Sequence, residues 1–116
     1  MNLENHLNAK EGSFILALRC DLEWNNESFK ELLYLILEEA KKTKDDKTIS
    51  KDTASGIWFV NDFVKNWAEH DNFPKSNSVE YYDKAYQLLN EVTYTYFLSE
   101  SPYESEETLK NMIDEL

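Results

Sequence analysis

The stretch that decides the fold is Ala54-Ser-Gly-Ile-Trp-Phe-Val-Asn-Asp-Phe-Val-Lys-Asn-Trp-Ala68. At about 100° per residue, its apolar side chains cover about two thirds of a helix circumference and leave only a narrow polar strip. A helix that is apolar over so wide an arc needs neighbours on several sides. The stretch therefore predicts a central helix over about residues 53–69. We expect four of its side chains to be buried: Trp58, Val60, Val64 and Trp67.

Helical periodicity also extends to other segments of the chain. Residues 28–42 place apolar side chains on one face and charged side chains on the other, with Ser28 as the N-cap. Residues 78–98 repeat this pattern behind an N-cap at Ser78. Residues 104–116 predict a short acidic helix with one apolar side. The polar segments between these helices predict exposed loops.

The first twenty residues allow more than one interpretation. A stripe at helical spacing joins five apolar residues: Leu3, Leu7, Phe14, Ala17 and Leu18. Gly12-Ser13 would break this stripe into two shorter helices. The apolar run over residues 14–18 is also compatible with a buried strand, which leaves residues 13–20 open between helix and strand. We favour helix because no second strand is evident to pair with it.

The low content of turn-forming residues indicates the fold class. The chain has 116 residues, with two glycines and two prolines, and a β-sandwich or barrel needs more. A chain of this length is expected to form one domain and to bury about two thirds of its unfolded surface. We therefore predict an all-α, compact single domain over residues 1–116, a bundle of four to six helices around the helix at residues 53–69.

Negative charge is concentrated in the last third of the chain. The 12 basic and 23 acidic residues give a formal net charge of −11. Residues 76–116 hold nine acidic and two basic residues, a net charge of −7, whereas residues 44–75 hold six and five, a net charge of −1. Such a surface repels nucleic acid and anionic lipid and attracts basic partners. Solubility alone explains the acidity equally well.

Cysteine content and hydropathy indicate compartment and redox state. The single cysteine, Cys20, excludes an internal disulfide, and its place beside an apolar run predicts a buried thiol. The N-terminus lacks the basic and apolar segments of a signal peptide. The longest apolar run, at residues 14–18, is too short to cross a membrane. We expect a cytoplasmic protein that does not bind membranes.

No set of residues predicts catalysis, and we expect neither an enzyme, nor a metal site, nor a bound cofactor. Glu69-His70-Asp71 groups metal-ligand types, but adjacent residues at a helix end point in different directions. The pairs Glu38-Glu39 and Asp45-Asp46 lie on a solvated face and in a polar loop, not in a pocket that shifts a pKa. The sequence has no glycine-rich phosphate loop, no nucleophile elbow and no basic patch for nucleic acid.

Two tyrosines stand apart from the other aromatic residues, most of which have core spacing. Tyr94 falls on the polar face of residues 78–98, and Tyr103 lies in the acidic C-terminal segment. An exposed tyrosine among carboxylates is typical of an interface anchor for a basic partner, and an incidental surface tyrosine is the alternative. The candidate partner-binding surface comprises Glu80, Asp83, Gln87, Glu91, Tyr94, Tyr103, Glu104, Glu106 and Glu107.

Small size, acidity, helical pattern and exposed tyrosines together resemble bacterial immunity proteins, of the nuclease-colicin and contact-dependent growth inhibition types. The resemblance covers the whole chain and rests on no diagnostic motif. Tyr81-Tyr82 is similar to the paired tyrosines of colicin immunity proteins. Here, however, the pair lies within a predicted helix and points mainly inward, so no site residue is carried over. The resemblance implies a protein that binds and neutralises a cationic toxin domain, usually a nuclease.

Two other functions stay open at this point. An acidic DNA mimic would inhibit a nucleic-acid-binding enzyme, and mimicry requires carboxylates in rows spaced like phosphates. Basic residues interrupt the acidic ones in this chain: Lys30, Lys41, Lys42 and Lys84. A structural or interaction module with no inhibitory role is the third possibility, for which acidity would serve only solubility.

Overall fold

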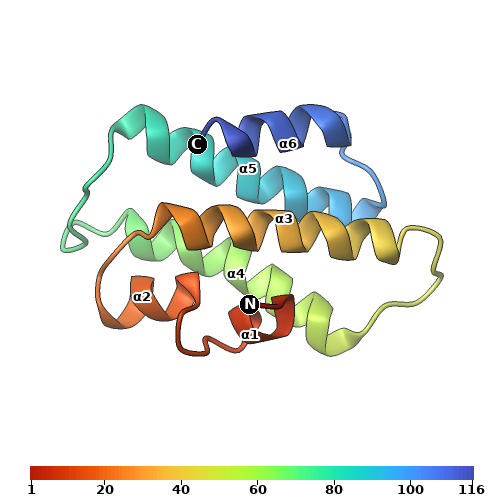
Figure 1. The fold of residues 1–116 in the computed structure, drawn as a ribbon, viewed down its shortest axis with the longest axis horizontal. Coiled ribbons are helices and arrows are strands. Elements are labelled where there is room, and N and C mark those ends of the chain that lie inside the picture. The colour runs from red at the N-terminus through yellow and green to blue at the C-terminus, as the bar shows by residue number, and fades with distance from the viewer.

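Six helices make up the structure, a computed structural model that describes residues 1–116 (Figure 1). They are α1 (Leu3–Leu7), α2 (Phe14–Cys20), α3 (Asn26–Lys42), α4 (Lys51–Ala68), α5 (Val79–Leu98) and α6 (Glu106–Asp114). No residue lies in a strand, so the prediction of an all-α bundle is confirmed. None of the six helices combines the length and the apolarity that a bilayer-spanning helix requires.

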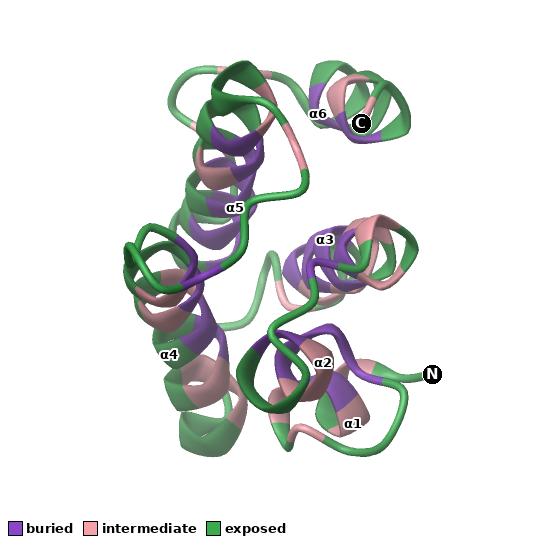
Figure 2. Cartoon of the chain, turned by 90° about the vertical axis from the view of Figure 1, so that its left-hand side faces the viewer, coloured by how far each residue is buried: buried purple, intermediate pink, exposed green.

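The helices form two layers with the core between them (Figure 2). α4 and α5 run antiparallel in one layer, joined by a loop (Figure 1). α3 lies in the other layer, between α6 on one side and α1 and α2 on the other (Figure 2). Because α3 also packs against α5, it has neighbours on three sides. Six of its residues are buried: Phe29, Leu32, Leu33, Ile36, Leu37 and Ala40.

The prediction that neighbours enclose α4 is correct for its inner face and wrong for its outer arc. Val60 and Val64 are buried as expected, but Trp58 is 61% exposed and Trp67 is only partly buried. α4 packs against α5 and against the short helices α1 and α2, and nothing covers its outer arc. A wide apolar arc predicts that neighbouring helices cover it, but it does not determine whether the chain has helices in the right place. In this bundle α3 is the helix with neighbours on three sides.

Asn and Ser side chains set the start of every helix. In each case the side-chain oxygen accepts a hydrogen bond from a backbone N–H of the first turn, and the N-caps are Asn2, Ser13, Asn25, Ser50, Ser78 and Ser105. The predicted cap at Ser78 is confirmed, but the one at Ser28 is wrong, because Asn25 already caps α3. Gly12, with φ +89°, separates α1 from α2, so residues 2–20 form two short helices and no strand.

Aromatic side chains from four elements close one end of the core. The rings of Phe14, Trp24 and Phe29 have centroids 4.8–4.9 Å apart. Trp24 lies in the α2–α3 connection and folds back onto the core, as expected, where its Nε1 donates to the Tyr81 hydroxyl at 2.8 Å. Cys20, in contrast, is exposed at the end of α2, so the expected buried thiol is wrong. Residue 20 is the last of that helix and points away from the stripe that packs.

Hydrogen bonds fasten α6 to α3. The Tyr34 hydroxyl bonds to the Asp114 carboxylate, and this bond raises the pKa of Tyr34 to about 12. The side chains of Asn26 and Lys30 donate to the carbonyl oxygens of Leu116 and Asp114, both at 3.2 Å. α6 itself buries only Leu109 and Ile113. These polar contacts therefore help to hold a short, acidic helix against the bundle.

Candidate functional site

The structure brings Tyr94 and Tyr103 together. Tyr94 lies on α5, Tyr103 lies in the α5–α6 loop, and their ring centroids are 6.4 Å apart with an interplanar angle of 56°. Tyr94 is 39% exposed and Tyr103 is 71% exposed. Two aromatic rings from different segments thus form one surface feature, which we call the tyrosine pair. Neither ring belongs to the core.

A buried carboxylate fixes the loop that carries Tyr103. Glu91, on α5, is only 6% exposed, and its Oε2 accepts a hydrogen bond from the Ser101 hydroxyl at 2.6 Å. The Ser101 oxygen in turn accepts the backbone N–H groups of Tyr103 and Glu104, at 3.2 and 3.1 Å. The sequence-based placement of Glu91 on an exposed, partner-facing surface is therefore wrong. Glu91 positions the loop and is not available to a partner.

A cavity of about 460 Å³ opens beside the tyrosine pair. Leu37 and Ala40 of α3 contribute apolar surface to it, and Tyr103 and Pro102 line it from the loop. Charged side chains also line it, three of them acidic and two basic: Glu100, Glu104, Glu106, Lys41 and Lys44. A long cationic side chain would find apolar contacts for its stem there and carboxylates for its charged end.

The remaining predicted residues divide into two groups. Glu106 and Glu107 lie in the first turn of α6, where Glu106 lines the cavity and pairs with Lys110 at 3.3 Å. Glu80, Asp83 and Gln87 are exposed on α5. Glu80, however, precedes Tyr94 by 14 residues, which is about 21 Å along a helix. The compact part of the site is therefore the tyrosine pair with Glu104, Glu106 and the cavity.

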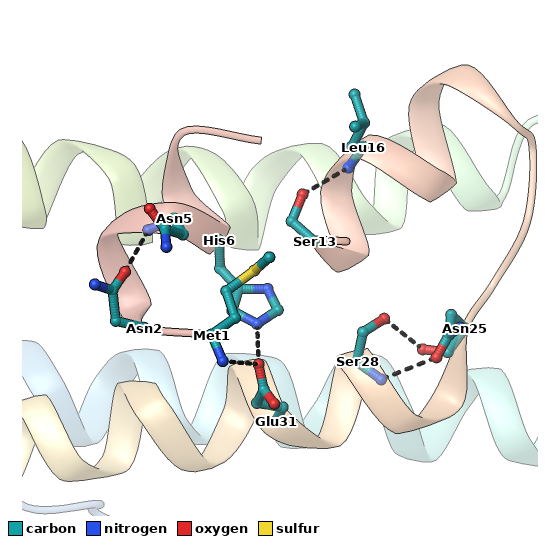
Figure 3. Close-up of polar contacts among 9 residues, drawn as sticks. All are labelled: Met1, Asn2, Asn5, His6, Ser13, Leu16, Asn25, Ser28 and Glu31. Atoms are coloured by element: carbon teal, nitrogen blue, oxygen red, sulfur yellow. Dashed lines mark hydrogen bonds and ion pairs between the residues drawn. The ribbon is translucent and has the colours of Figure 1, made fainter. Parts of the chain in front are cut away.

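Sequence reasoning missed a fully buried histidine. His6 of α1 donates a hydrogen bond from Nε2 to Glu31 Oε1, at 2.7 Å, and the amino group of Met1 lies 3.6 Å from the same oxygen (Figure 3). The His6 contact is the main cause that lowers the pKa of Glu31. The signal was present, because His6 lies next to Leu3 and Leu7 on the helical stripe. Solvent does not reach His6, and the pair joins α1 to α3.

Sequence reasoning also missed a surface of stacked aromatic rings on α4. Phe59, Phe63 and Trp67 stack in series along the helix with both centroid distances at 5.3 Å, and we call them the aromatic stripe. The helical spacing of these aromatic residues predicts a core position, but Phe59 is 46% exposed. Spacing alone does not tell a core face from an exposed apolar face.

Side chains of the types that bind metal ions do not cluster in this structure. No group of three or more His, Cys, Asp or Glu side chains is placed to hold a metal ion. His70 accepts the backbone N–H of Asn72 at Nδ1, a local contact at the end of α4. Comparison of the chain with protein-family models, with curated proteins and with solved structures found no match. The structure itself therefore defines the class: an all-α protein with an exposed surface of aromatic and acidic side chains.

Proposed function

We propose that this protein is an immunity protein, which binds and neutralises a cationic bacterial toxin domain with nuclease activity. The observation that carries the proposal is the tyrosine pair beside an acidic-rimmed cavity. Tyrosine is enriched among residues that dominate binding energy, and carboxylates around it select a basic partner. The proposed role is binding, not catalysis, and such an inhibitor acts in the cytoplasm of the cell that it protects.

The two kinds of side chain would contribute to different steps of binding. The net charge of −7 over residues 76–116 would attract a basic domain and raise the association rate. Tyr94 and Tyr103 would be covered in the complex and slow its dissociation. Because Ser101 already holds the loop, little ordering of Tyr103 would be needed on binding. Neutralisation would follow from covering the active site or from repelling the nucleic acid substrate.

The DNA-mimic alternative receives less support from this surface. Lys41 and Lys44 line the same cavity as the carboxylates, so the negative charge is not an uninterrupted row. A nucleic-acid-binding enzyme would meet two cations among the carboxylates, where DNA presents an uninterrupted row of phosphates. An interaction module without inhibitory activity would use the same tyrosine pair and differs only in its partner.

The proposal predicts that a neighbouring gene encodes a basic toxin domain, and the affinity of the two proteins tests it. Tyr94→Ala should weaken binding by about 2 kcal/mol or more, if Tyr94 is a hot spot, and Glu104→Lys with Glu106→Lys should mainly slow association. Phe97→Ala is the matched control, because Phe97 lies on the same helix and is equally exposed. If the Tyr94→Ala variant and the Glu104→Lys, Glu106→Lys variant bind the toxin domain as tightly as wild type, and salt has no effect on binding, the proposed surface is refuted.

A further inference from the structure

The outer arc of α4 exposes two large aromatic side chains side by side in the sequence. Trp58 and Phe59 project into solvent, and Phe59 begins the aromatic stripe that continues through Phe63 to Trp67. Protein–protein interfaces are enriched in Trp and Phe, and a contiguous apolar patch on a small protein marks an interaction site. The patch lies on α4, away from the α5–α6 loop that carries Tyr103.

The same helix also has a groove two turns beyond Phe59. A cavity of about 410 Å³ lies at the C-terminal end of α4 and is lined mainly by Leu22, Phe63, Trp67 and Phe73. Leu22 has φ +53°, a conformation that is strained for a side chain of its size, and its side chain stays exposed at this cavity. The helix therefore presents a projecting phenyl ring and, about 12 Å along its axis, an apolar recess.

The charge on α4 suits a second copy of the chain. The whole chain carries −11, so most pairs of surfaces from two copies repel each other. α4 is neutral, because Lys51 and Lys65 balance Asp52 and Asp62. α3, α5 and α6 each carry net negative charge. The exposed aromatic arc of α4 thus lies on the long helix that repels a second copy least.

Two-fold symmetry makes this surface complementary to itself. If two α4 helices lie antiparallel with the axis beside Phe63, residues whose numbers sum to about 126 face each other. Phe59 of one copy then lies opposite Trp67 of the other, at the apolar recess. Asp62 lies opposite Lys65, which in the single chain reaches only Glu69, at 3.8 Å. In such an arrangement every contact occurs twice.

From these four observations we infer that α4 is the interface of a homodimer, in which Phe59 of each copy fills the recess between Trp67 and Phe73 of the other. The paired Asp62 and Lys65 set the antiparallel register. The inference does not depend on the proposed function, since it uses a different surface. In the dimer, each copy keeps its own tyrosine pair and the cavity beside it.

Sedimentation equilibrium over a concentration series, up to about 1 mM, tests this inference. Wild type should reach twice the 13.7 kDa of one chain, and Phe59→Asp should stay at the mass of one chain. Phe97→Asp is the matched control, because it places the same charge on an exposed phenylalanine of α5, and it should dimerise like wild type. Circular dichroism of each variant establishes that it is folded.

Charge exchange tests the register separately. Asp62→Lys or Lys65→Asp alone should weaken the dimer about tenfold, because like charges then face each other twice. The double variant Asp62→Lys with Lys65→Asp should restore it, since the exchange preserves each pair. Wild type that remains a monomer at every concentration, or Phe59→Asp that dimerises like wild type, overturns the interface. If the double variant dimerises no more tightly than either single variant, the proposed register is wrong.

Discussion

The carboxylate of Glu91 and the hydroxyl of Ser101 form a 2.6 Å hydrogen bond that joins the last turns of α5 to the α5–α6 loop. Ser101 uses the same oxygen to accept two backbone N–H groups, those of Tyr103 and Glu104. One buried acid thereby determines where an exposed aromatic ring stands. A carboxylate that the pattern of α5 assigns to solvent is instead part of the support for the candidate site.

Removal of the Ser101 hydroxyl should destabilise this loop. Ser101→Ala leaves a Glu91 oxygen and two backbone N–H groups without their partner, at a cost of about 1–3 kcal/mol in the free energy of unfolding. Chemical denaturation measures that loss, and hydrogen exchange should show faster exchange at the amides of Tyr103 and Glu104. Ser76→Ala, at an exposed serine that makes no hydrogen bond, serves as the control. If the amides of Tyr103 and Glu104 exchange at the same rate in Ser101→Ala as in wild type, Ser101 does not hold the loop.

Stability should fall in acid through Glu31. Its pKa in the folded protein is lowered from 4.5, mainly by the hydrogen bond with His6, so folding favours the ionised carboxylate. The contribution is fully present above about pH 4.5 and is lost as the pH falls through the lowered value. Wild type should therefore exceed Glu31→Gln in the free energy of unfolding at pH 7, and the difference should shrink below pH 4.5.

Glu38→Gln is the control for this pH dependence, because Glu38 is an exposed carboxylate of the same helix without an ion pair. Its difference from wild type should be small at every pH. A gap between wild type and Glu31→Gln that stays constant from pH 7 to pH 3 would show that the His6–Glu31 contact has no ionic part. Urea titrations at each pH supply the values.

Gly56→Ala should destabilise the protein, although alanine favours helix by about 1 kcal/mol. An added Cβ would lie 2.9 Å from Leu7 Cδ1 and 3.2 Å from Leu7 Cβ, so α1 would have to move away from α4. The cost of such overpacking is about 1–3 kcal/mol, which exceeds the gain in helix propensity. In a Leu7→Ala background the contact with Cδ1 is absent and only the 3.2 Å contact with Cβ remains, so Gly56→Ala should cost clearly less than in wild type. The double-mutant cycle measures this difference.

Trp58→Ala should have little effect on the stability of the single chain. Its side chain is mostly exposed, and exposed substitutions stay within about 0.5 kcal/mol. Phe29→Ala should cost about 3–5 kcal/mol, because Phe29 is fully buried between Phe14 and Trp24. Denaturation in dilute solution compares the two. A loss above about 2 kcal/mol for Trp58→Ala would show that a neighbour covers the outer arc of α4.

Periodicity and capping residues were sufficient to predict the all-α fold and most helix boundaries. Ser78 begins α5 as predicted, and Gly12 separates α1 from α2. These are local effects, because a cap or a glycine acts on its own turn. Which helix would be enclosed was not predictable in the same way. Both α3 and α4 have apolar faces, and only the packing of α6 and α5 against α3 decides between them.

The candidate site was predictable only in part, because local spacing predicts which side chains are exposed but not which segments come together. The polar face of α5 correctly indicated that Tyr94 is exposed, and the acidic segment did so for Tyr103. Their closeness depends on how the α5–α6 loop folds back, which no spacing rule contains. Glu91 falls on the polar face by angle, yet the loop covers it. The loop is held by Ser101, an unremarkable residue in the sequence.

The three tryptophans occupy three different environments, which gives the chain built-in optical probes. Indole emission shifts to longer wavelength in water, and collisional quenchers such as acrylamide reach only open rings. Trp24 is shielded and lies edge-on to Tyr82 and Tyr86, from which it can receive excitation energy, so its signal should follow unfolding. Trp58 is open to quencher, so its signal should follow whatever covers α4. Tryptophan-to-phenylalanine variants that leave one indole at a time would let fluorescence separate loss of the core from occupation of the surface.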